Sequence, residues 1–523
     1  MKNSSDPIRR LLYPLTILLG LTFAAGCAGM IRTAPVASLW ERAAAVLPAW
    51  LSGHLISAVL AVGGFVFFLL LFPRAFRRLY PIFRLFRWRE FIMLLKPESA
   101  KAFFVGCLRA AGGISLSAAV GLGLLTLVFS RPVGENVEQH MRENASVIAE
   151  EGMHPDLTPL CLSRLDNFTD SIMLLEASDD TEDTALNRAI LAYRGRFQRD
   201  QWLEPCETLV EHYGEGVPFD AVETYPRYWH GYLVFLRPLL NRMNYASIRT
   251  LNGAVQTLLL LLLLGLMKKC GLSHAIPLWL LSVGMLMPLA LARSFQYSSC
   301  YYILTLGIIA LLLRWPGKDR RRLLFTLFLS MGIATAYFDF LTYPLAVYGL
   351  PMTVWLLLSQ DRSGEEHLAD VVRGGIFWCV GYGGMWAGKW ALAALLAGEA
   401  SFSDALWAIA LRTSVMDAGG AIRYGVLGTL LTNILAFCYT PLLFLVLWLL
   451  LSRLRRTRAA GSGEDASRAM PFLVLAVLPL LWYAVLRNHS AIHFCFTNKA
   501  LSVTLFALLS AVTPGASSKN SVY

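Results

Sequence analysis

The chain has 523 residues, of which 56% are hydrophobic and 15% are charged. Soluble globular proteins are about 45–50% apolar and about 25% charged, so this composition excludes a soluble enzyme, a disordered chain and a fibrous protein. The formal net charge is +11, but the basic residues occur in short runs between apolar stretches. A nucleic-acid-binding protein gathers its basic residues on one soluble face, so the sequence argues against nucleic acid as a partner and for a lipid bilayer.

Charge divides the chain into two unlike parts. Residues 131–230 contain 20 of the 35 acidic residues and 8 of the 46 basic residues, which gives this segment a net charge of −12. The rest of the chain has a net charge of +23. This distribution is typical of a multi-pass membrane protein, because cytoplasmic loops keep Lys and Arg whereas acidic residues have little effect on orientation.

Apolar stretches of about 20 residues predict an all-α polytopic membrane protein with about twelve transmembrane helices. The predicted spans are 11–31, 51–72, 103–129, 251–267, 273–292, 300–314, 323–339, 341–359, 374–396, 425–451, 470–486 and 500–514. With the N-terminus in the cytoplasm, this order puts every strongly basic connection on the cytoplasmic side. These connections are Arg9–Arg10, 74–101, Lys268–Lys269, 318–322, 362–373 and 453–458. We therefore expect both termini in the cytoplasm.

Residues 1–102 form a predicted N-terminal unit of two spans in front of the main membrane body, 103–514. The unit ends in YPIFRLFRWREFIMLLK at 80–96, which mixes Arg with aromatic residues and Leu. A helix of this composition lies at the membrane interface, with Arg toward lipid phosphates and rings toward acyl chains. The segment therefore predicts membrane anchoring rather than catalysis.

One long segment outside the membrane, 131–250, separates the third and fourth predicted spans. A loop of this length in a compact protein is usually functional or disordered. The string LDNFTDSIMLLEA places Asp166 and Asp170 four positions apart at the start of a helix, where both carboxylates face one side. We take both as candidate catalytic residues, and we keep helix capping and metal binding as alternatives, since Asp, Asn and Thr are the usual N-terminal residues of helices.

A second string in this segment, RYWHGYLVFLRPLL at 227–240, is basic and aromatic. Arg227 and Arg237 lie on the predicted outer side and so run against the positive-inside bias. Recognition of a phosphate group is the simplest local reason for them, with His230 in a supporting position. An interfacial helix whose Arg residues only touch lipid headgroups is the alternative.

Further ionisable residues are predicted at the outer ends of later spans, where such residues are functional hypotheses by default. They are Asp339, Lys389, His489, His493 and Lys499. Each of these residues, taken alone, is compatible with a structural role or with a side chain that extends to the membrane surface. Because they come from several elements and lie on the same predicted side, together they favour a shared outer site. His489 and His493 are four residues apart and suit a metal, yet no third ligand is visible. A divalent metal therefore stays an open alternative, and the pattern requires no cofactor.

Two of the nine cysteines, Cys161 and Cys206, fall in the acidic outer segment. A disulfide forms there only if the segment lies in an oxidising compartment. The sequence leaves open whether these two residues are paired.

The chain resembles the GT-C superfamily of integral membrane glycosyltransferases, of the bacterial envelope type. The likeness covers most of 103–514 and is carried by LDNFTDSIML, RYWHGYLVFLRPLL, AYFDFLTYP, GYGGMWAGKW and NHSAIHFCFTNK. It implies a GT-C-like fold in a bacterial plasma membrane. It also implies sugar transfer from a polyprenyl-phosphate-linked donor to an envelope glycan or other acceptor at the extracytoplasmic face.

The resemblance also implies roles for the candidate residues. Asp166 or Asp170 takes the acceptor proton as general base. The donor phosphate is bound by residues drawn from Arg227, Arg237, Lys389, His489, His493 and Lys499, with Asp339 and His230 in support. One departure leaves the base undecided, because the acid of this family lies close after the first span, whereas Asp166 lies some 35 residues past the preceding span.

Two other functions remain open. An envelope-polysaccharide polymerase or ligase has the same general layout and differs in transferring a whole repeat unit. A transporter or flippase for a lipid-linked sugar is the other alternative. Transporters tend to have internal repeats and charges at the middle of the bilayer, and the sequence shows neither.

Overall fold

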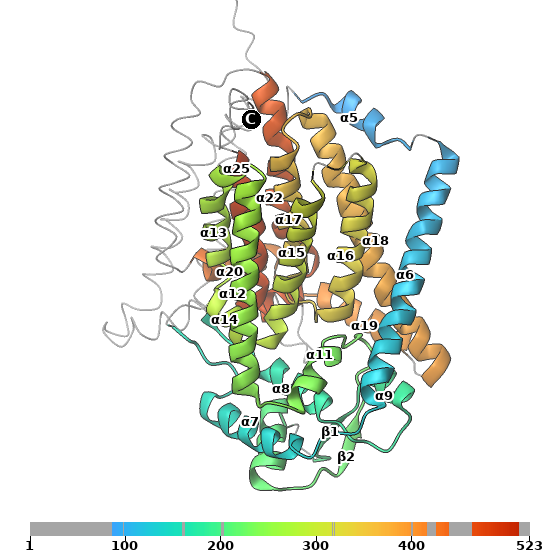
Figure 1. Cartoon of the computed structure of the whole chain (residues 1–523), viewed down its shortest axis with the longest axis vertical. Coiled ribbons are helices and arrows are strands. Elements are labelled where there is room, and N and C mark those ends of the chain that lie inside the picture. Colours follow the sequence, from blue (N-terminus) through green and yellow to red (C-terminus); the bar gives the residue numbers. More distant parts are fainter. Residues whose placement is uncertain are drawn as a thin grey trace, which may run out of the picture.

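The computed structural model describes residues 86–97, 99–158, 163–199, 203–315, 317, 319–398, 401–415, 425–438 and 463–511. Figure 1 shows a bundle of long helices with a smaller domain at one end. The smaller domain is formed by residues 130–244, between the third and fourth predicted spans, and we refer to it as the loop domain. The predicted spans at 11–31 and 51–72 lie outside the described residues.

The bundle is built from apolar helices. Its main helices are α6 (Ala100–Phe129), α12 (Tyr245–Lys269), α15 (Phe295–Arg314), α16 (Arg320–Phe338), α17 (Pro344–Leu358), α18 (Gly364–Ala397), α20 (Val426–Cys438), α22 (Gly463–Val485) and α25 (Leu501–Ala511). Short helices α19 (Ser401–Thr413), α23 (Arg487–Ile492) and α24 (Phe494–Thr497) lie between them at the loop-domain end.

Five helical segments of the described chain are long and apolar enough to cross a membrane. These segments are Ala100–Phe129, Tyr245–Lys269, Phe295–Arg314, Ser467–Val485 and Phe494–Ala511. Each reaches the length of about 20 residues that a bilayer core of ~30 Å requires, or comes close to it. The chain is therefore a mostly helical protein with membrane-spanning character, and the total of about twelve spans stays a prediction.

One predicted span is divided in the structure. The sequence predicts a single helix over 273–292, but α13 (Ile276–Gly284) ends before Met287 and α14 (Pro288–Arg293) begins after it. Met287 has a φ of 56°, and Pro288 follows it. Proline has no amide hydrogen to continue a helix and disfavours helical geometry in the residue before it, so the break falls at this position.

Helix α18 is longer than the predicted span at 374–396. It begins ten residues earlier, because Ser363 and Glu366 form a reciprocal capping box at its N-terminus. At ~1.5 Å per residue its 34 residues extend about 50 Å, well beyond the apolar core of a bilayer. Its C-terminal end therefore reaches the loop domain.

The described basic connections lie at the end of the bundle opposite the loop domain. Lys268 and Lys269 end α12, Arg314 ends α15, and Arg320 begins α16. The short helix α5 (Trp88–Leu95) docks at this same end (Figure 1), where Arg87 forms an ion pair of 3.0 Å with the buried Glu365 of α18. Trp88, Ile92 and Met93 on α5 are exposed, as an interfacial helix requires.

The loop domain is helical with one small ribbon that the sequence analysis did not predict. Its helices are α7 (Val137–Glu151), α8 (Asn167–Ala177), α9 (Ala185–Leu191), α10 (Pro205–Leu209), the π-helical turn η3 (Val210–Gly214) and α11 (Leu233–Leu240). Strands β1 (Arg194–Arg196) and β2 (Ala221–Glu223) pair antiparallel, with Arg194 opposite Glu223.

A shared hydrophobic core joins the loop domain to the bundle. Trp229 and Leu233 from the loop domain pack in one buried cluster with Tyr337 of α16 and Met385 of α18. The Trp229 indole N–H donates to the Met385 carbonyl at 2.7 Å. The backbone N–H of Gly231 donates to the Tyr337 carbonyl at 2.9 Å. These contacts fix where the loop domain sits on the bundle.

Glycines allow α16 and α18 to touch along their backbones. A Cβ atom on Gly332 would lie 2.1 Å from the Trp378 carbonyl oxygen, and one on Gly381 would lie 2.3 Å from that of Leu329. Small residues at such contacts let membrane helices approach closely. The position of α18, and of everything at its outer end, depends on this contact.

The variant Gly332→Ala tests this contact. Its methyl group must push α16 and α18 apart, so we expect a loss of about 1–3 kcal/mol in stability, measured by thermal unfolding in detergent micelles. Gly383→Ala is the matched control, because a Cβ at Gly383 meets nothing within 4 Å. Equal melting temperatures for Gly332→Ala and the wild type would contradict the prediction.

Candidate functional site

Asp170 lies at the centre of the contact between the loop domain and the bundle. It sits in the first turn of α8, is fully buried, and accepts hydrogen bonds from the backbone amides of Phe295 and Gln296 at 3.0 and 3.1 Å. These amides are the first two of α15, whose N-terminus would otherwise leave them unpaired. The Tyr245 hydroxyl donates to the same carboxylate at 2.6 Å.

An arginine completes this buried network. Arg249 of α12 donates to the Tyr245 hydroxyl at 2.6 Å and to Asn167 Oδ1 at 2.8 Å. Its other terminal nitrogen binds Glu151 at 2.8 Å. Burial raises the pKa of Asp170 to about 6, while Arg249 and the hydrogen bonds oppose that rise. With its oxygens already bound, Asp170 is suited to holding α8 against α15, and this geometry favours the capping alternative for it.

Asp166 has a different setting. It is the N-cap of α8, where one oxygen accepts from the Thr169 amide at 3.1 Å and the other from the Thr169 hydroxyl at 2.9 Å. His154 Nδ1 lies 3.8 Å from the carboxylate, and its ring is 43% exposed. Burial raises the pKa of Asp166 to about 6. Asp166 therefore caps α8, and its titratable neighbour, His154, is partly exposed to solvent.

On the bundle, two histidines lie at the contact with α19: His489 is in α23, and His493 follows that helix directly. Arg412 of α19 is 3.2 Å from His493 Nε2. Burial and the neighbouring charges of His489, Arg412 and His154 lower the pKa of His493 well below its ordinary value. His154 thus contacts Asp166 at 3.8 Å, and it acts on His493 through the influence of its charge.

Basic side chains also gather around Tyr225. The guanidinium carbon of Arg194 is 5.2 Å from the centre of its ring, and that of Arg227 is 5.8 Å from it. The positive charge of Arg412 also acts on Tyr225. We call these residues, Arg194, Arg227 and Arg412 around Tyr225, the Tyr225 cation cluster. Arg227 is anchored there by a bidentate ion pair with Asp404 of α19, at 2.7 and 2.8 Å.

Another buried acid, Glu176 of α8, lies beside the Tyr225 cation cluster, with Oε1 3.8 Å from Arg194. Glu176 is fully buried, and its Oε2 is 2.9 Å from His230 Nδ1 and hydrogen-bonded to the Tyr232 hydroxyl. His230 Nε2 contacts the Tyr225 carbonyl at 2.7 Å. Both ring nitrogens of His230 therefore face oxygen atoms that accept hydrogen bonds.

Four predicted phosphate ligands donate instead to backbone carbonyls. Arg237 binds the carbonyls of Ala177 and Asp179 at the C-terminus of α8, at 2.9 and 2.7 Å. The other three donate to one carbonyl each: Lys389 Nζ to Ile190 at 2.6 Å, His489 to Leu341 at 2.7 Å and Lys499 Nζ to Leu286 at 3.1 Å. All four are buried. Such contacts support packing and capping, so phosphate binding by these residues stays a prediction.

Asp339, the predicted supporting acid, ends α16 and caps the next turn. Its carboxylate accepts from the Thr342 amide at 3.0 Å and from the Thr342 hydroxyl. It is 3% exposed. The residue is therefore engaged in shaping the connection between α16 and α17.

The described residues contain no group of three His, Cys, Asp or Glu side chains placed to hold a metal ion. The rings of His489 and His493 have centroids 4.9 Å apart, and His489 Nε2 already contacts a carbonyl. Cys206 is a free, buried thiol that contacts Ser171 at 3.3 Å. Whether Cys206 pairs with Cys161 stays open, because Cys161 lies outside the described residues.

The sequence analysis missed several members of this junction. Glu176, Arg194 and Arg412 were not singled out, since each stands alone in its local string. His154 had no motif around it. Only the fold brings these residues to Asp166, Arg227, His230 and His493, from at least four separate segments of the chain. Comparisons with family models, curated proteins and solved structures found no match to this chain.

The variant Asp170→Ala tests the structural role of the buried carboxylate. Removing it leaves two helix-end amides and the Tyr245 hydroxyl without their partner, so we expect a loss of about 3 kcal/mol in stability. Thermal unfolding in detergent micelles measures this loss. Asp180→Ala, at an exposed position in the same domain, should unfold with the wild type. A wild-type melting temperature for Asp170→Ala would show that the carboxylate does not hold the domain.

Proposed function

We propose that this chain is a membrane glycosyltransferase, which moves a sugar from a polyprenyl-phosphate-linked donor to an acceptor hydroxyl at the outer face of the membrane. The observation that carries the proposal is the junction between the loop domain and the bundle. Asp166, His154, Arg194 and Arg227 belong to the loop domain, and His493 and Arg412 belong to the bundle. A carboxylate and several cations at one junction are the groups that transfer from a phosphate-linked donor needs.

Asp166 serves as the general base in this proposal. It accepts the proton of the acceptor hydroxyl as the acceptor oxygen bonds to the anomeric carbon of the sugar. The bond between that carbon and the donor phosphate oxygen breaks, and the electron pair leaves with the polyprenyl phosphate. A base works best when its pKa is near the working pH, and burial raises the pKa of Asp166 toward that range.

The leaving phosphate needs positive charge as it departs. Arg227 and Arg412 are the partly exposed arginines of the Tyr225 cation cluster, and a planar guanidinium matches the geometry of phosphate oxygens. Fixed cations in a partly dry site stabilise developing negative charge strongly, because they need no reorganisation during the reaction. Arg227 is held by Asp404, so its direction is set before a donor binds.

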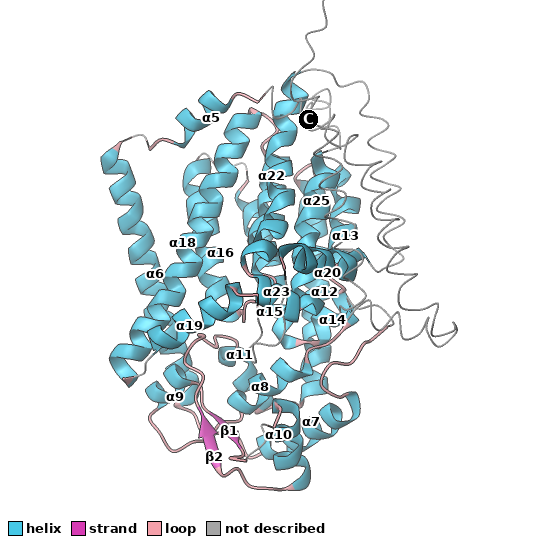
Figure 2. Cartoon of the chain, turned by 180° about the vertical axis from the view of Figure 1, so that it is seen from behind, coloured by secondary structure: helices cyan, strands magenta, loops and turns pink. Residues whose placement is uncertain are grey.

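The bundle offers an apolar surface for the lipid part of such a donor. A groove of about 840 Å³ lies between α6 and α18, and Ala118, Leu122, Leu127 and Leu392 are among its mostly apolar lining residues. Figures 1 and 2 show α6 at the edge of the bundle, diverging from α18 toward the end that carries α5. A polyprenyl chain can therefore approach from the bilayer without displacing a packed helix.

The positions of buried ionisable residues count against the transporter alternative. In the described bundle, Glu365, His367 and Asp370 lie in the first two turns of α18, whereas Lys389 lies 19 to 24 residues further along the same helix. At ~1.5 Å per residue that separation is about 28–36 Å, close to the ~30 Å of the apolar core, so these groups lie toward its two ends. Transport pathways usually place such groups near the middle of the membrane.

The variant Asp166→Asn tests the base. Asparagine is an equally good N-cap, so the fold should persist, while transfer from a polyprenyl-phosphate-linked sugar should fall about 100-fold or more. In the wild type, kcat/KM should decline as the pH falls below about 6, because the protonated carboxyl cannot accept a proton. Asp156→Asn, which removes an exposed acid paired with Arg164, is the control. Full transfer activity in Asp166→Asn would remove the assignment.

The variant Arg412→Gln tests the phosphate side of the junction. We expect a loss of about 100-fold in transfer rate, comparable to removing one donor from a charge-stabilising site. Arg468→Gln removes an exposed arginine of α22 and should leave the rate unchanged. Equal rates for both variants in the same purified assay would show that Arg412 takes no part in transfer.

A further inference from the structure

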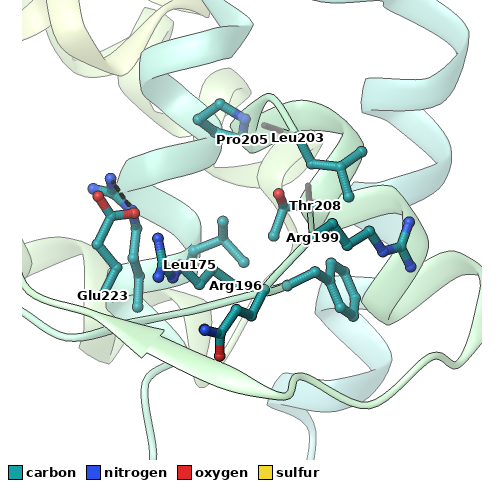
Figure 3. Close-up of a pocket in the computed structure, with 11 residues that line it drawn as sticks. Leu175, Arg196, Arg199, Leu203, Pro205, Thr208 and Glu223 are labelled. Carbon is teal, nitrogen blue, oxygen red and sulfur yellow. Dashed lines mark ion pairs between the residues drawn. The ribbon is translucent and has the colours of Figure 1, made fainter. Parts of the chain in front are cut away.

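A small cavity of about 80 Å³ lies in the loop domain, between β1, β2, α10 and the C-terminal end of α8. Figure 3 shows its lining, to which Arg196 and Arg199 contribute from one side and Pro205 and Thr208 from another. Arg194 and Glu223 complete its charged lining. Three arginines thus line a cavity inside the most acidic part of the chain. Their positive charges must be balanced by nearby acids or by a bound anion.

Two of these arginines are already neutralised. Arg194 forms an ion pair of 2.9 Å with Glu223, its partner across the ribbon. Arg199 is paired with Glu211 of η3. In Figure 3 Arg199 points away from Glu223, toward the opposite edge of the cavity. Neither residue therefore demands a further anion.

Arg196 has no such partner among the described residues. It forms no ion pair and no side-chain hydrogen bond with any of them, and its Nε is buried without a hydrogen-bond partner. Arg194 Nη1 in the same wall is likewise buried without a hydrogen bond, although the carboxylate of Glu176 lies 3.8 Å away. A buried donor left unpaired typically costs about 1–3 kcal/mol, so both groups are suited to a ligand that accepts hydrogen bonds.

We propose that this cavity is a binding site for an oxyanion, the phosphate or carboxylate group of a ligand outside the membrane, held by Arg196 and Arg194. Of the residues assigned to sugar transfer only Arg194 also lines the cavity, whereas Asp166, Arg227 and Arg412 do not, so Arg196→Gln tests the cavity apart from the glycosyltransferase assignment. An oxyanion supplies several acceptor lone pairs and one or two negative charges, which matches two arginines with unused donors and one uncompensated positive charge.

The size of the cavity limits what it can hold. One water needs roughly 10–15 Å³ of space in this measure, and the cavity offers about 80 Å³. A phosphate or carboxylate group therefore fits this space, and the site recognises an anionic group of its ligand.

Isothermal titration of the full chain in detergent micelles tests the proposal, with inorganic phosphate in one arm and acetate in the other at constant ionic strength. We expect saturable binding of at least one anion to the wild type, and binding at least tenfold weaker, or about 1.4 kcal/mol, for Arg196→Gln. Arg164→Gln is the matched control, because it removes one arginine of the same domain that is paired with Asp156.

Each outcome decides the matter. Binding of phosphate alone supports a phosphate-bearing ligand, and binding of acetate with similar affinity supports a carboxylate. If Arg196→Gln does not fold, Arg196→Lys keeps the charge but loses the Nε donor, and its binding should still be weaker than that of the wild type. Absence of saturable binding in both arms, or equal losses in Arg196→Gln and Arg164→Gln, would overturn the proposal.

Discussion

The carboxylate of Asp170 belongs to α8 of the loop domain, yet it accepts hydrogen bonds from the first two backbone amides of α15 in the bundle. A helix N-terminus carries unpaired amides and partial positive charge, so this carboxylate satisfies both at once. Arg249 and Tyr245 of α12 then bind around it. The position of α8 on the bundle follows from this buried network.

Once α8 is fixed, its two ends arrange the rest of the junction. Its N-cap, Asp166, is held beside His154, and its C-terminal carbonyls are bound by Arg237. Glu176, the second-last residue of the helix, meets His230 and Arg194. Three buried acids of the loop domain, Asp166, Asp170 and Glu176, therefore lie along one short helix and its N-cap. This explains how a domain with a large acidic excess can pack tightly against an apolar bundle.

Polar residues at this junction differ in what they bind. Asp170, Arg237, Lys389 and Lys499 contact backbone amides or carbonyls, which are fixed parts of the chain. Arg227 and Arg412 are partly exposed, whereas Asp166 is buried and caps its own helix. Proximity of opposite charges alone is a weak argument for stability, because burial costs both partners their hydration. The presence of Arg227 and Arg412 at this junction is easier to understand if these residues bind a ligand.

The sequence by itself determined the class of protein and the place of its unusual segment. Spacing of apolar residues located the helices α6, α12, α15, α16 and α17 to within several residues. A segment that crosses lipid must satisfy its own backbone hydrogen bonds, so a long apolar segment forms a helix. Local residue types also signalled the start of α8, where Asp and Thr cap a helix. Composition located the acidic loop domain and the interfacial segment that contains α5.

Only the tertiary structure decided which polar residues meet. Asp166 and Asp170 look alike in the sequence, and their difference arises because α15 begins beside one of them and His154 lies beside the other. The pairing of Arg227 with Asp404 joins residues 177 positions apart, and Glu176, Arg194 and Arg412 carry no local pattern. Hydrophobic periodicity records which face of an element is buried, but not what it is buried against, so the partners of a charge follow from packing between distant segments.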